Sequence, residues 1–105
     1  MPAASVDATI AVSAVIDATP PSAPSNLSAA LKGKRVILAW KAASDANGIA
    51  SYAVRRSGVL LAQVGGSTLS YTDDSNVRGS FTYTIVAADA AGNLSAPSNA
   101  VTVSR

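Results

Sequence analysis

Short segments in which apolar and polar residues alternate recur along this chain from about residue 26 onward, and each is closed by Gly, Asn, Asp or Ser. In an extended strand, alternation places every second side chain on the same face. Short strands at this spacing, separated by turn residues, are typical of an all-β sandwich or barrel. No stretch combines an apolar period near 3.6 residues with capping signals, so we expect essentially no helix.

The pattern predicts seven strands. In the second, Val36, Leu38 and Trp40 share one face, and in the sixth and longest the alternation makes one face core and the other solvent. Seven antiparallel strands joined by short turns form a two-layer sandwich. The predicted strands cover residues 26–31, 35–40, 49–54, 60–64, 69–73, 81–87 and 100–103.

Two turns carry specific predictions. Ser57-Gly58 is a two-residue hairpin signal. The last turn, from Asp89 to Asn93, invites a calcium interpretation because Asp and Asn oxygens suit that ion, but two side-chain oxygens fall well short of the roughly six to eight ligands that calcium takes. We therefore expect Asp89 and Asn93 to bond nearby backbone while Gly92 adopts a positive φ.

Aromatic residues are few, and most are expected in the core. Trp40 should be the largest single burial, surrounded by the other four aromatics. The alternative is that some of them are sugar-stacking platforms on the surface, for which the core could spare only Tyr52 or Tyr71. Their placement on alternating strand faces favours the core. The four are Tyr52, Tyr71, Phe81 and Tyr83.

Three residue types that carry most enzyme chemistry are missing, because the chain has no His, Cys or Glu. Without His, a Ser-His-Asp or Cys-His nucleophile cannot be assembled. Without all three, no ordinary zinc or iron site can form. Six aspartates are the only carboxylates, and a glycosidase-like Asp pair would still lack insertions that form a cleft. We therefore predict no catalytic, cofactor-binding or metal-binding residues, and no cofactor.

The formal net charge is +2, with Lys32, Lys34 and Arg35 close together. A solvated turn explains these residues better than a nucleic-acid patch, because no aromatic platform accompanies them and nucleic-acid binders usually carry more charge. No apolar run approaches the roughly 18 residues of a membrane span. No charged-then-apolar start indicates a signal peptide, so the signal of an exported protein would lie upstream. We expect neither nucleic acid nor membrane as a partner.

Four short motifs lie on or beside the predicted strands: Pro24-x-x-Leu27, Val36-x-Leu38-x-Trp40, Tyr52-x-Val54-x-Arg56 and Tyr83-x-Ile85-x-Ala87. Together they resemble the fibronectin type III family. A Trp in the second strand is typical of that family, whereas immunoglobulin domains place theirs in the third strand beside a disulfide. The resemblance covers residues 20–105 and implies a seven-stranded antiparallel immunoglobulin-like β-sandwich of fibronectin type III topology.

Two longer motifs narrow the resemblance to a bacterial group: Trp40-x-x-x-Ser44-Asp-x-x-Gly48-Ile-x-x-Tyr52-x-Val54 and Ala87-x-Asp89-Ala-Ala-Gly-Asn93-x-Ser95-x-Pro97-Ser98. Similar modules are found between the catalytic and carbohydrate-binding domains of secreted chitinases, cellulases and polyester depolymerases. The resemblance implies a non-catalytic accessory or spacer module of a larger secreted, extracellular bacterial enzyme, with the neighbouring domains as partners. Two alternatives stay open: weak binding of insoluble polysaccharide, and surface adhesion or protein recognition by the loops at 45–47 and 89–93.

The sequence departs from the family pattern at two places. The family usually has a Tyr at the position of Phe81, with its hydroxyl bonded back to the backbone. The resemblance therefore implies that the Phe81 ring packs and that the corner hydrogen bond is lost. Adhesive members carry Arg-Gly-Asp in the last turn, where this chain has Asp89-Ala-Ala-Gly-Asn93, so integrin binding does not carry over.

The first nineteen residues contain a further strand pattern outside the seven. In one interpretation residues 1–19 are a tail or inter-module segment, and Thr19-Pro20-Pro21 is a stiff, extended linker. In the other, a strand at 5–17 pairs onto an exposed sheet edge, within the chain or between chains. We favour the tail and expect a monomer whose domain begins at residue 20. The alternating residues are Val6, Ala8, Ile10, Val12, Ala14 and Ile16.

Overall fold

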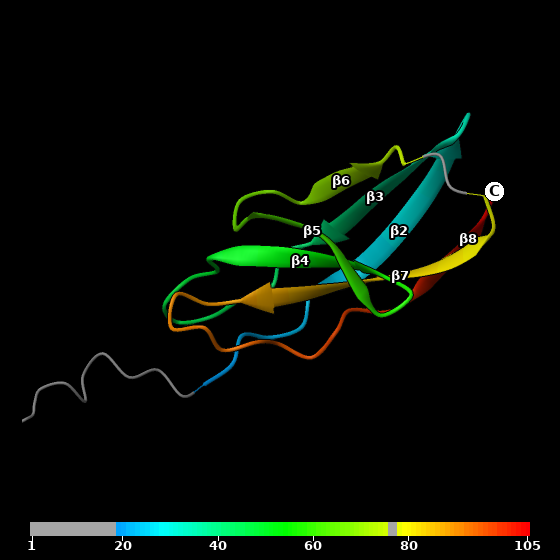
Figure 1. Ribbon diagram of the computed structural model, residues 1–105. Coiled ribbons are helices and arrows are strands. Elements are labelled where there is room, and N and C mark those ends of the chain that lie inside the picture. The colour runs from blue at the N-terminus through cyan, green and yellow to red at the C-terminus, as the bar shows by residue number, and fades with distance from the viewer. Residues whose placement is uncertain (1–18, 76–77) are drawn as a thin grey trace, which may run out of the picture.

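The computed structural model describes residues 19–75 and 78–105, and in these ranges all regular structure is β-strand (Figure 1). Every predicted strand is present with ends within two residues of the prediction, which confirms the all-β class. The described ranges hold no helix that is long and apolar enough to cross a membrane. The strands are β2 (Ser25–Lys32), β3 (Arg35–Lys41), β4 (Ser51–Arg56), β5 (Val59–Gly65), β6 (Ser70–Asp73), β7 (Ser80–Ala88) and β8 (Val101–Ser104).

The strands form two antiparallel sheets that pack against each other (Figure 1). One sheet has three strands in the order β2-β3-β6, and the other has four in the order β5-β4-β7-β8. The chain changes sheet between β3 and β4, between β5 and β6 and between β6 and β7. The predicted seven-stranded two-layer sandwich is therefore confirmed.

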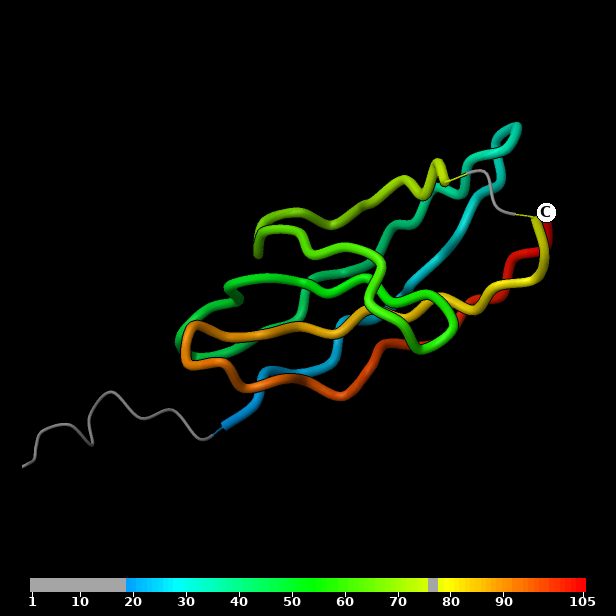
Figure 2. Tube along the Cα trace, viewed as in Figure 1, coloured from blue at the N-terminus to red at the C-terminus, as the bar shows by residue number. Residues whose placement is uncertain are grey.

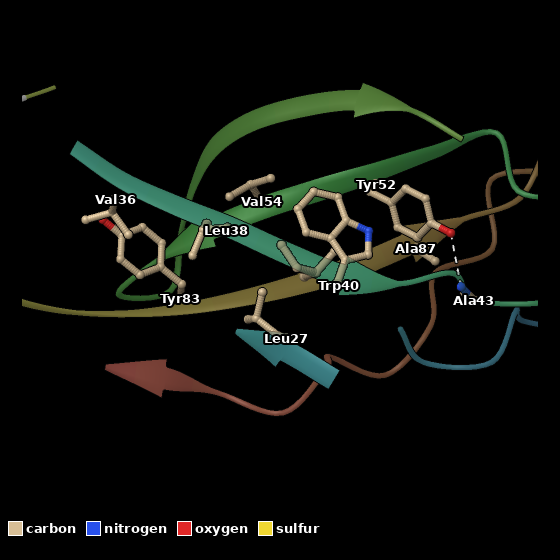
Figure 3. Packing of buried hydrophobic residues seen from close by; sticks show 10 residues of the cluster. Leu27, Val36, Leu38, Trp40, Ala43, Tyr52, Val54, Tyr83 and Ala87 are labelled. Atoms are coloured by element: carbon tan, nitrogen blue, oxygen red, sulfur yellow. Dashed lines mark hydrogen bonds between the residues drawn. The ribbon is translucent and has the colours of Figure 1, made fainter. Parts of the chain in front are cut away.

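Alternation along the strands produces the core between the sheets. On β3, Val36, Leu38 and Trp40 are buried, whereas Arg35, Ala39 and Lys41 between and beside them are exposed. The facing sheet contributes residues of β4 and β7 (Figure 3). The buried cluster consists of Leu27, Val36, Leu38, Trp40, Ala43, Tyr52, Val54, Tyr83, Ile85 and Ala87.

Trp40 packs against Tyr52 at one end of this core. The ring centroids lie 5.7 Å apart with an interplanar angle of 63°, an edge-to-face arrangement. The Tyr52 hydroxyl accepts a hydrogen bond of 3.0 Å from the backbone N–H of Ala43 (Figure 3). Tyr83 lies toward the other end of the core, so the prediction that it helps to surround Trp40 is wrong. The reason is register: Tyr52 pairs with Ala87, four residues further along β7 from Tyr83, which is about 13 Å of strand.

The predicted hairpin turn between β4 and β5 is confirmed. Ser57 and Gly58 both adopt positive φ, 53° and 81°, as a type I′ turn requires. The Ser57 N–H donates to the Thr82 carbonyl at 2.7 Å, which extends the pairing with β7 one residue beyond Arg56.

Residues 94–100 run beside β7 without forming a regular strand, because serine side chains replace part of the ladder. Ser95 N–H donates to the Ala87 carbonyl and Ser95 Oγ accepts from the Ala87 N–H, both at 2.8 Å. Ser98 repeats the arrangement with Ile85 at 2.8 and 2.9 Å. These two serines thus satisfy four buried backbone groups of β7 around Pro97, which has no N–H of its own.

The Asn99 side chain likewise bonds both backbone groups of one residue, here Leu27 of β2. Its Nδ2 donates to the Leu27 carbonyl at 3.0 Å, and its Oδ1 accepts from the Leu27 N–H at 2.9 Å. Leu27 belongs to the three-stranded sheet and Asn99 leads into β8 of the other. One amide side chain therefore ties the two sheets together at the edge where β2 and β8 meet.

The segment that leads into β2 lies against the sandwich. Pro21 and Pro24 are buried. Ser22 N–H donates to the Ser44 carbonyl, and Ser44 N–H donates to Ser22 Oγ, both at 2.9 Å. The predicted strand at 5–17 lies outside the described residues.

Candidate functional site

The loops and turns of the sandwich gather at two opposite ends (Figure 2). Residue 19, where the described chain begins, lies at one end with the loops at 44–48 and 89–93. Arg105 lies at the other end with the turn at 33–34.

A buried carboxylate lies at the Arg105 end of the sandwich. Asp73, on β6, is 2% exposed. Its Oδ2 accepts hydrogen bonds from Tyr83 Oη at 2.6 Å, Arg56 Nη1 at 2.9 Å and Arg105 Nη2 at 3.0 Å. Its Oδ1 accepts from Ser75 Oγ at 2.6 Å and from the Ser75 N–H at 3.1 Å. Both carboxylate oxygens are therefore occupied by donors.

The Asp73 cluster bridges the two sheets. Asp73 belongs to the three-stranded sheet, whereas Arg56 and Tyr83 belong to β4 and β7 of the four-stranded sheet. Arg105 follows β8 directly. A carboxylate held by two guanidinium groups and a phenol therefore closes this end of the core, and these donors offset the cost of burying its charge.

The hydrogen bonds decide how these groups ionise. Burial alone would raise the pKa of Asp73, but the bonds from Ser75, Tyr83 and Arg56 outweigh it and hold that pKa far below its usual 3.8. Burial, with the charged Asp73 as hydrogen-bond partner, raises the pKa of Tyr83 to about 12. At neutral pH the pair is therefore a fixed carboxylate and a fixed phenol, with no group poised to exchange a proton.

Phe81 occupies the outer side of this cluster. The guanidinium carbons of Arg56 and Arg105 lie 5.1 and 5.9 Å from its ring centroid, within the range of cation–π contacts. The prediction that the Phe81 ring packs is confirmed, since it is half-buried against the core. Phe81 has no hydroxyl to donate to the backbone, and Tyr83, two residues further on the same face of β7, donates instead to the Asp73 side chain.

Arg105 is the residue of this cluster that sequence reasoning missed. Its side chain is 5% exposed, and its Nη1 donates to the Lys34 carbonyl at 2.7 Å. Before the strands are placed, Arg105 carries no local signal, because Lys34 is 71 and Asp73 is 32 positions away from it. Lys34 itself, with Lys32 and Arg35, is exposed, as expected of a solvated turn.

At the opposite end, the carboxylate of Asp89 closes the last turn. Asp89 is 3% exposed, and its Oδ1 accepts from the N–H groups of Ala91 at 3.0 Å and Asn93 at 2.9 Å. Its Oδ2 accepts from Asn93 Nδ2 at 3.0 Å, and Gly92 has a φ of 91°. The prediction is confirmed for the Asp89 side chain, which bonds nearby backbone, and for the positive φ at Gly92, whereas the Asn93 amide donates to the Asp89 carboxylate. Among the described residues, no three His, Cys, Asp or Glu side chains gather where they could hold a metal ion.

The aromatic residues bear on sugar binding. Trp40, Tyr52 and Tyr83 are buried, and Tyr52 is fully inaccessible, so the expectation that Tyr52 could be spared from the core is wrong. Guanidinium groups cover the Phe81 ring. Tyr71 is half-buried. Within residues 19–75 and 78–105, therefore, no two exposed rings form a platform for a sugar to stack upon.

The strand order and the absence of a disulfide define an immunoglobulin-like sandwich of the fibronectin type III class. No protein-family model matches the chain. Over 90 residues it is 44% identical to chitinase A1 of Niallia circulans, which covers 85% of this chain and 13% of the chitinase. Over 91 residues it is 37% identical to exoglucanase B of Cellulomonas fimi, covering 83% of this chain and 8% of that enzyme.

A solved structure of an Fn3-like protein from Clostridium thermocellum superimposes with a TM-score of 0.68 at 28% identity, over 80% of this chain and 92% of that one. The chain is a fibronectin type III domain of the bacterial type found in chitinases and cellulases. It spans less than a fifth of the length of the curated relatives named above.

Proposed function

We propose that this domain is a non-catalytic accessory module of a larger extracellular bacterial enzyme, and that it holds the domains on either side of it at a fixed separation. The observation that carries the proposal is the unequal coverage of the relatives. Chitinase A1 matches 85% of this chain with only 13% of its own length. The rest of such an enzyme lies outside the module, so the module works beside other domains.

The arrangement of the two ends supports a spacer. The start of the described chain, drawn in blue, and the C-terminus lie at opposite ends of the sandwich (Figure 2). The nine residues of β7 run between these ends, a length of about 30 Å. Segments attached before residue 19 and after Arg105 would therefore be held apart by the length of a packed domain.

The state of the buried carboxylates supports a structural role over catalysis. Asp73 and Asp89 are each saturated with donors from their own cluster or turn. A catalytic acid needs a pKa near the working pH, whereas that of Asp73 is held far below it.

The alternative, weak binding of insoluble polysaccharide, needs exposed and coplanar aromatic rings. The rings here are buried, half-buried or covered by guanidinium groups. The other alternative, recognition of a protein by the loops at 45–47 and 89–93, has one point in its favour: both loops lie at the same end of the sandwich (Figure 2).

A sedimentation assay with insoluble chitin, cellulose and polyester separates these functions. We expect the chain to stay in the supernatant with all three polymers, as a spacer should. Retention on one polymer that soluble oligomers of that polymer compete away would overturn the spacer and support the binding module.

A second assay tests spacing directly in the larger enzyme. Replacing the module by a Gly/Ser linker of the same number of residues should leave hydrolysis of a soluble substrate unchanged and slow hydrolysis of the solid polymer, because a flexible linker does not hold its ends apart. Equal rates on both substrates would contradict the proposal.

A further inference from the structure

The backbone of Arg105 is held as a residue inside a sheet would be. Its N–H donates to the Gly79 carbonyl at 3.0 Å, and its carbonyl accepts from the Gly79 N–H at 2.7 Å. This pair continues the ladder of β7 and β8 one step past Ser80 and Ser104, which are register partners. An end residue of an edge strand usually frays because few contacts oppose its motion.

The side chain of Arg105 adds contacts with three other segments. Nη1 donates to the carbonyl of Lys34, in the turn between β2 and β3, at 2.7 Å. Nη2 donates to Asp73 Oδ2 at 3.0 Å. The guanidinium also lies over the Phe81 ring. We call Arg105 with its partners Lys34, Asp73 and Gly79 the C-terminal anchor.

The opposite charges of Arg105 and Asp73 add to the strength that the hydrogen bonds give the C-terminal anchor. The guanidinium is 5% and Asp73 2% exposed, so their attraction is poorly screened by solvent. Arg105 leaves this position only by withdrawing a charged donor from a buried carboxylate, which is costly. At the other end the chain enters through neutral bonds between Ser22 and Ser44. The exit is therefore held by a buried pair of opposite charges.

We propose that the C-terminal anchor fixes the direction in which the chain leaves the sandwich, so that the module is a rigid joint on its Arg105 side. This inference rests on the proposed spacer function and names the residues that perform it. Without the anchor, β8 has only four residues and a single partner strand, β7. The end of β8 would then fray, and a segment attached after Arg105 would no longer be held in one direction.

Backbone relaxation of the 105-residue chain tests the ordering. We expect order parameters at residues 101–105 near the ~0.85 of rigid backbone. In Arg105→Ala those of residues 103–105 should fall below ~0.6, and the Gly79 amide should exchange on the order of tenfold faster. Arg55→Ala, which removes an exposed arginine of β4, is the matched control and should change neither. An end that stays rigid in Arg105→Ala, or is mobile in the unaltered chain, would overturn the proposal.

Arg105→Lys keeps the charge but cannot reach Lys34 and Asp73 with a planar fork. We expect its order parameters to fall between those of the unaltered chain and Arg105→Ala. Thermal unfolding of each variant separates a loosened end from an unfolded domain. Order parameters in Arg105→Lys equal to those of the unaltered chain would show that charge alone holds the end and would contradict the directional role.

Small-angle scattering of the larger enzyme tests the joint itself. Arg105→Ala should broaden the distribution of distances between the domains that flank the module, and Arg55→Ala should not. An unchanged distribution beside a loosened end in the isolated chain would overturn the rigid joint while leaving the proposed spacer function to its own linker-replacement assay. Suppose instead that the relaxation and scattering results both support the anchor, but that replacing the module by a linker leaves the hydrolysis rates unchanged. That combination would overturn the proposed spacer function.

Discussion

Buried polar groups carry much of the specificity of this small domain at the scale of single residues. Asp73 is the hub, since five hydrogen bonds from Arg56, Ser75, Tyr83 and Arg105 converge on its two oxygens. A buried carboxylate is tolerated only with such partners, because desolvation otherwise opposes its charge. Removing one donor should therefore cost more than an average surface hydrogen bond.

Tyr83→Phe removes the shortest bond to Asp73 Oδ2 without changing the packing of the ring. A hydrogen bond to a charged group contributes about 1.5–3 kcal/mol, so we expect the free energy of unfolding in urea to fall by about that amount. Tyr71→Phe, at a half-buried tyrosine of β6, is the control and should change it by less than about 0.5 kcal/mol. Equal losses in the two variants would show that the Tyr83 hydroxyl has no special role.

The lowered pKa of Asp73 predicts a dependence on acid. Since its pKa in the folded domain lies below the ordinary 3.8, its contribution to stability is complete above that value and is lost progressively as the pH falls below it. Thermal unfolding between about pH 6 and pH 2, the range in which carboxylates titrate, should show this loss in the unaltered chain. Asp73→Asn should be less stable at pH 6 and should flatten the acid side of the curve. A curve of unchanged shape in Asp73→Asn would contradict the assignment.

The raised pKa of Tyr83 predicts a matching effect in alkali. Its contribution is complete below the ordinary value of 10.0 and is lost as the pH rises toward about 12. Titration of tyrosinate absorbance should show a component near pH 12 that Tyr83→Phe removes. The same late component in Tyr83→Phe would assign it to another tyrosine.

At the scale of elements, residues 94–100 show how side-chain hydrogen bonds take the place of part of a regular strand beside β7. Pro97 interrupts residues 94–100, yet the β7 groups opposite are satisfied by Ser95 and Ser98. Each serine supplies its own N–H as donor and its Oγ as acceptor to one residue of β7. The segment therefore closes the sheet edge and remains too irregular to recruit a further strand.

Ser98→Ala tests this replacement. It leaves the buried Ile85 N–H without its acceptor, which should lower the free energy of unfolding by about 1–3 kcal/mol in a denaturant titration. Ser104→Ala changes an exposed serine of β8 and serves as the control. A loss in Ser98→Ala no larger than that of the control would mean that solvent reaches Ile85 and that the hydroxyl is dispensable.

At the scale of the whole molecule, the domain is closed differently at its two ends. A buried carboxylate paired with two guanidinium groups closes the Arg105 end, whereas turns in which Asp89 and Ser22 accept hydrogen bonds from backbone N–H groups close the other. The matching regions are small parts of the longer chains of chitinase A1 and exoglucanase B. The proposed C-terminal anchor is part of the charged cluster at the Arg105 end.

Deleting residues 1–19 tests the predicted domain boundary at residue 20. If these residues are a tail, the melting temperature should stay within about 2 °C, well inside the ~4–8 °C that a loss of 1 kcal/mol produces in a domain of this size. Sedimentation velocity should show a monomer before and after the deletion. A lower melting temperature or a change of oligomeric state would favour the strand at 5–17 that pairs onto a sheet edge.

Much of the fold could be predicted from local features. Alternation located all seven strands, and Ser57-Gly58 and Gly92 marked turns that need positive φ. The Asp89 turn was also predictable, because its partners lie within four residues. Two features were missed. The ion pair of Asp73 with Arg105 joins residues that are distant in the sequence. The bond between Ser98 and Ile85 uses a serine hydroxyl in place of a backbone carbonyl, so no strand pattern indicates it.

The sequence by itself determined which residues extend, which face of each strand is apolar and where the chain turns, because these depend on neighbours within a few positions. Only the tertiary structure decided the register between strands. A slip of two residues leaves every side chain on the same face, so the alternation of apolar and polar residues cannot distinguish the two registers. Such a slip would nevertheless separate Tyr83 from Asp73. The charged closure of the sandwich, and with it the direction of the Arg105 exit, therefore follows from the packed sheets and not from any single segment.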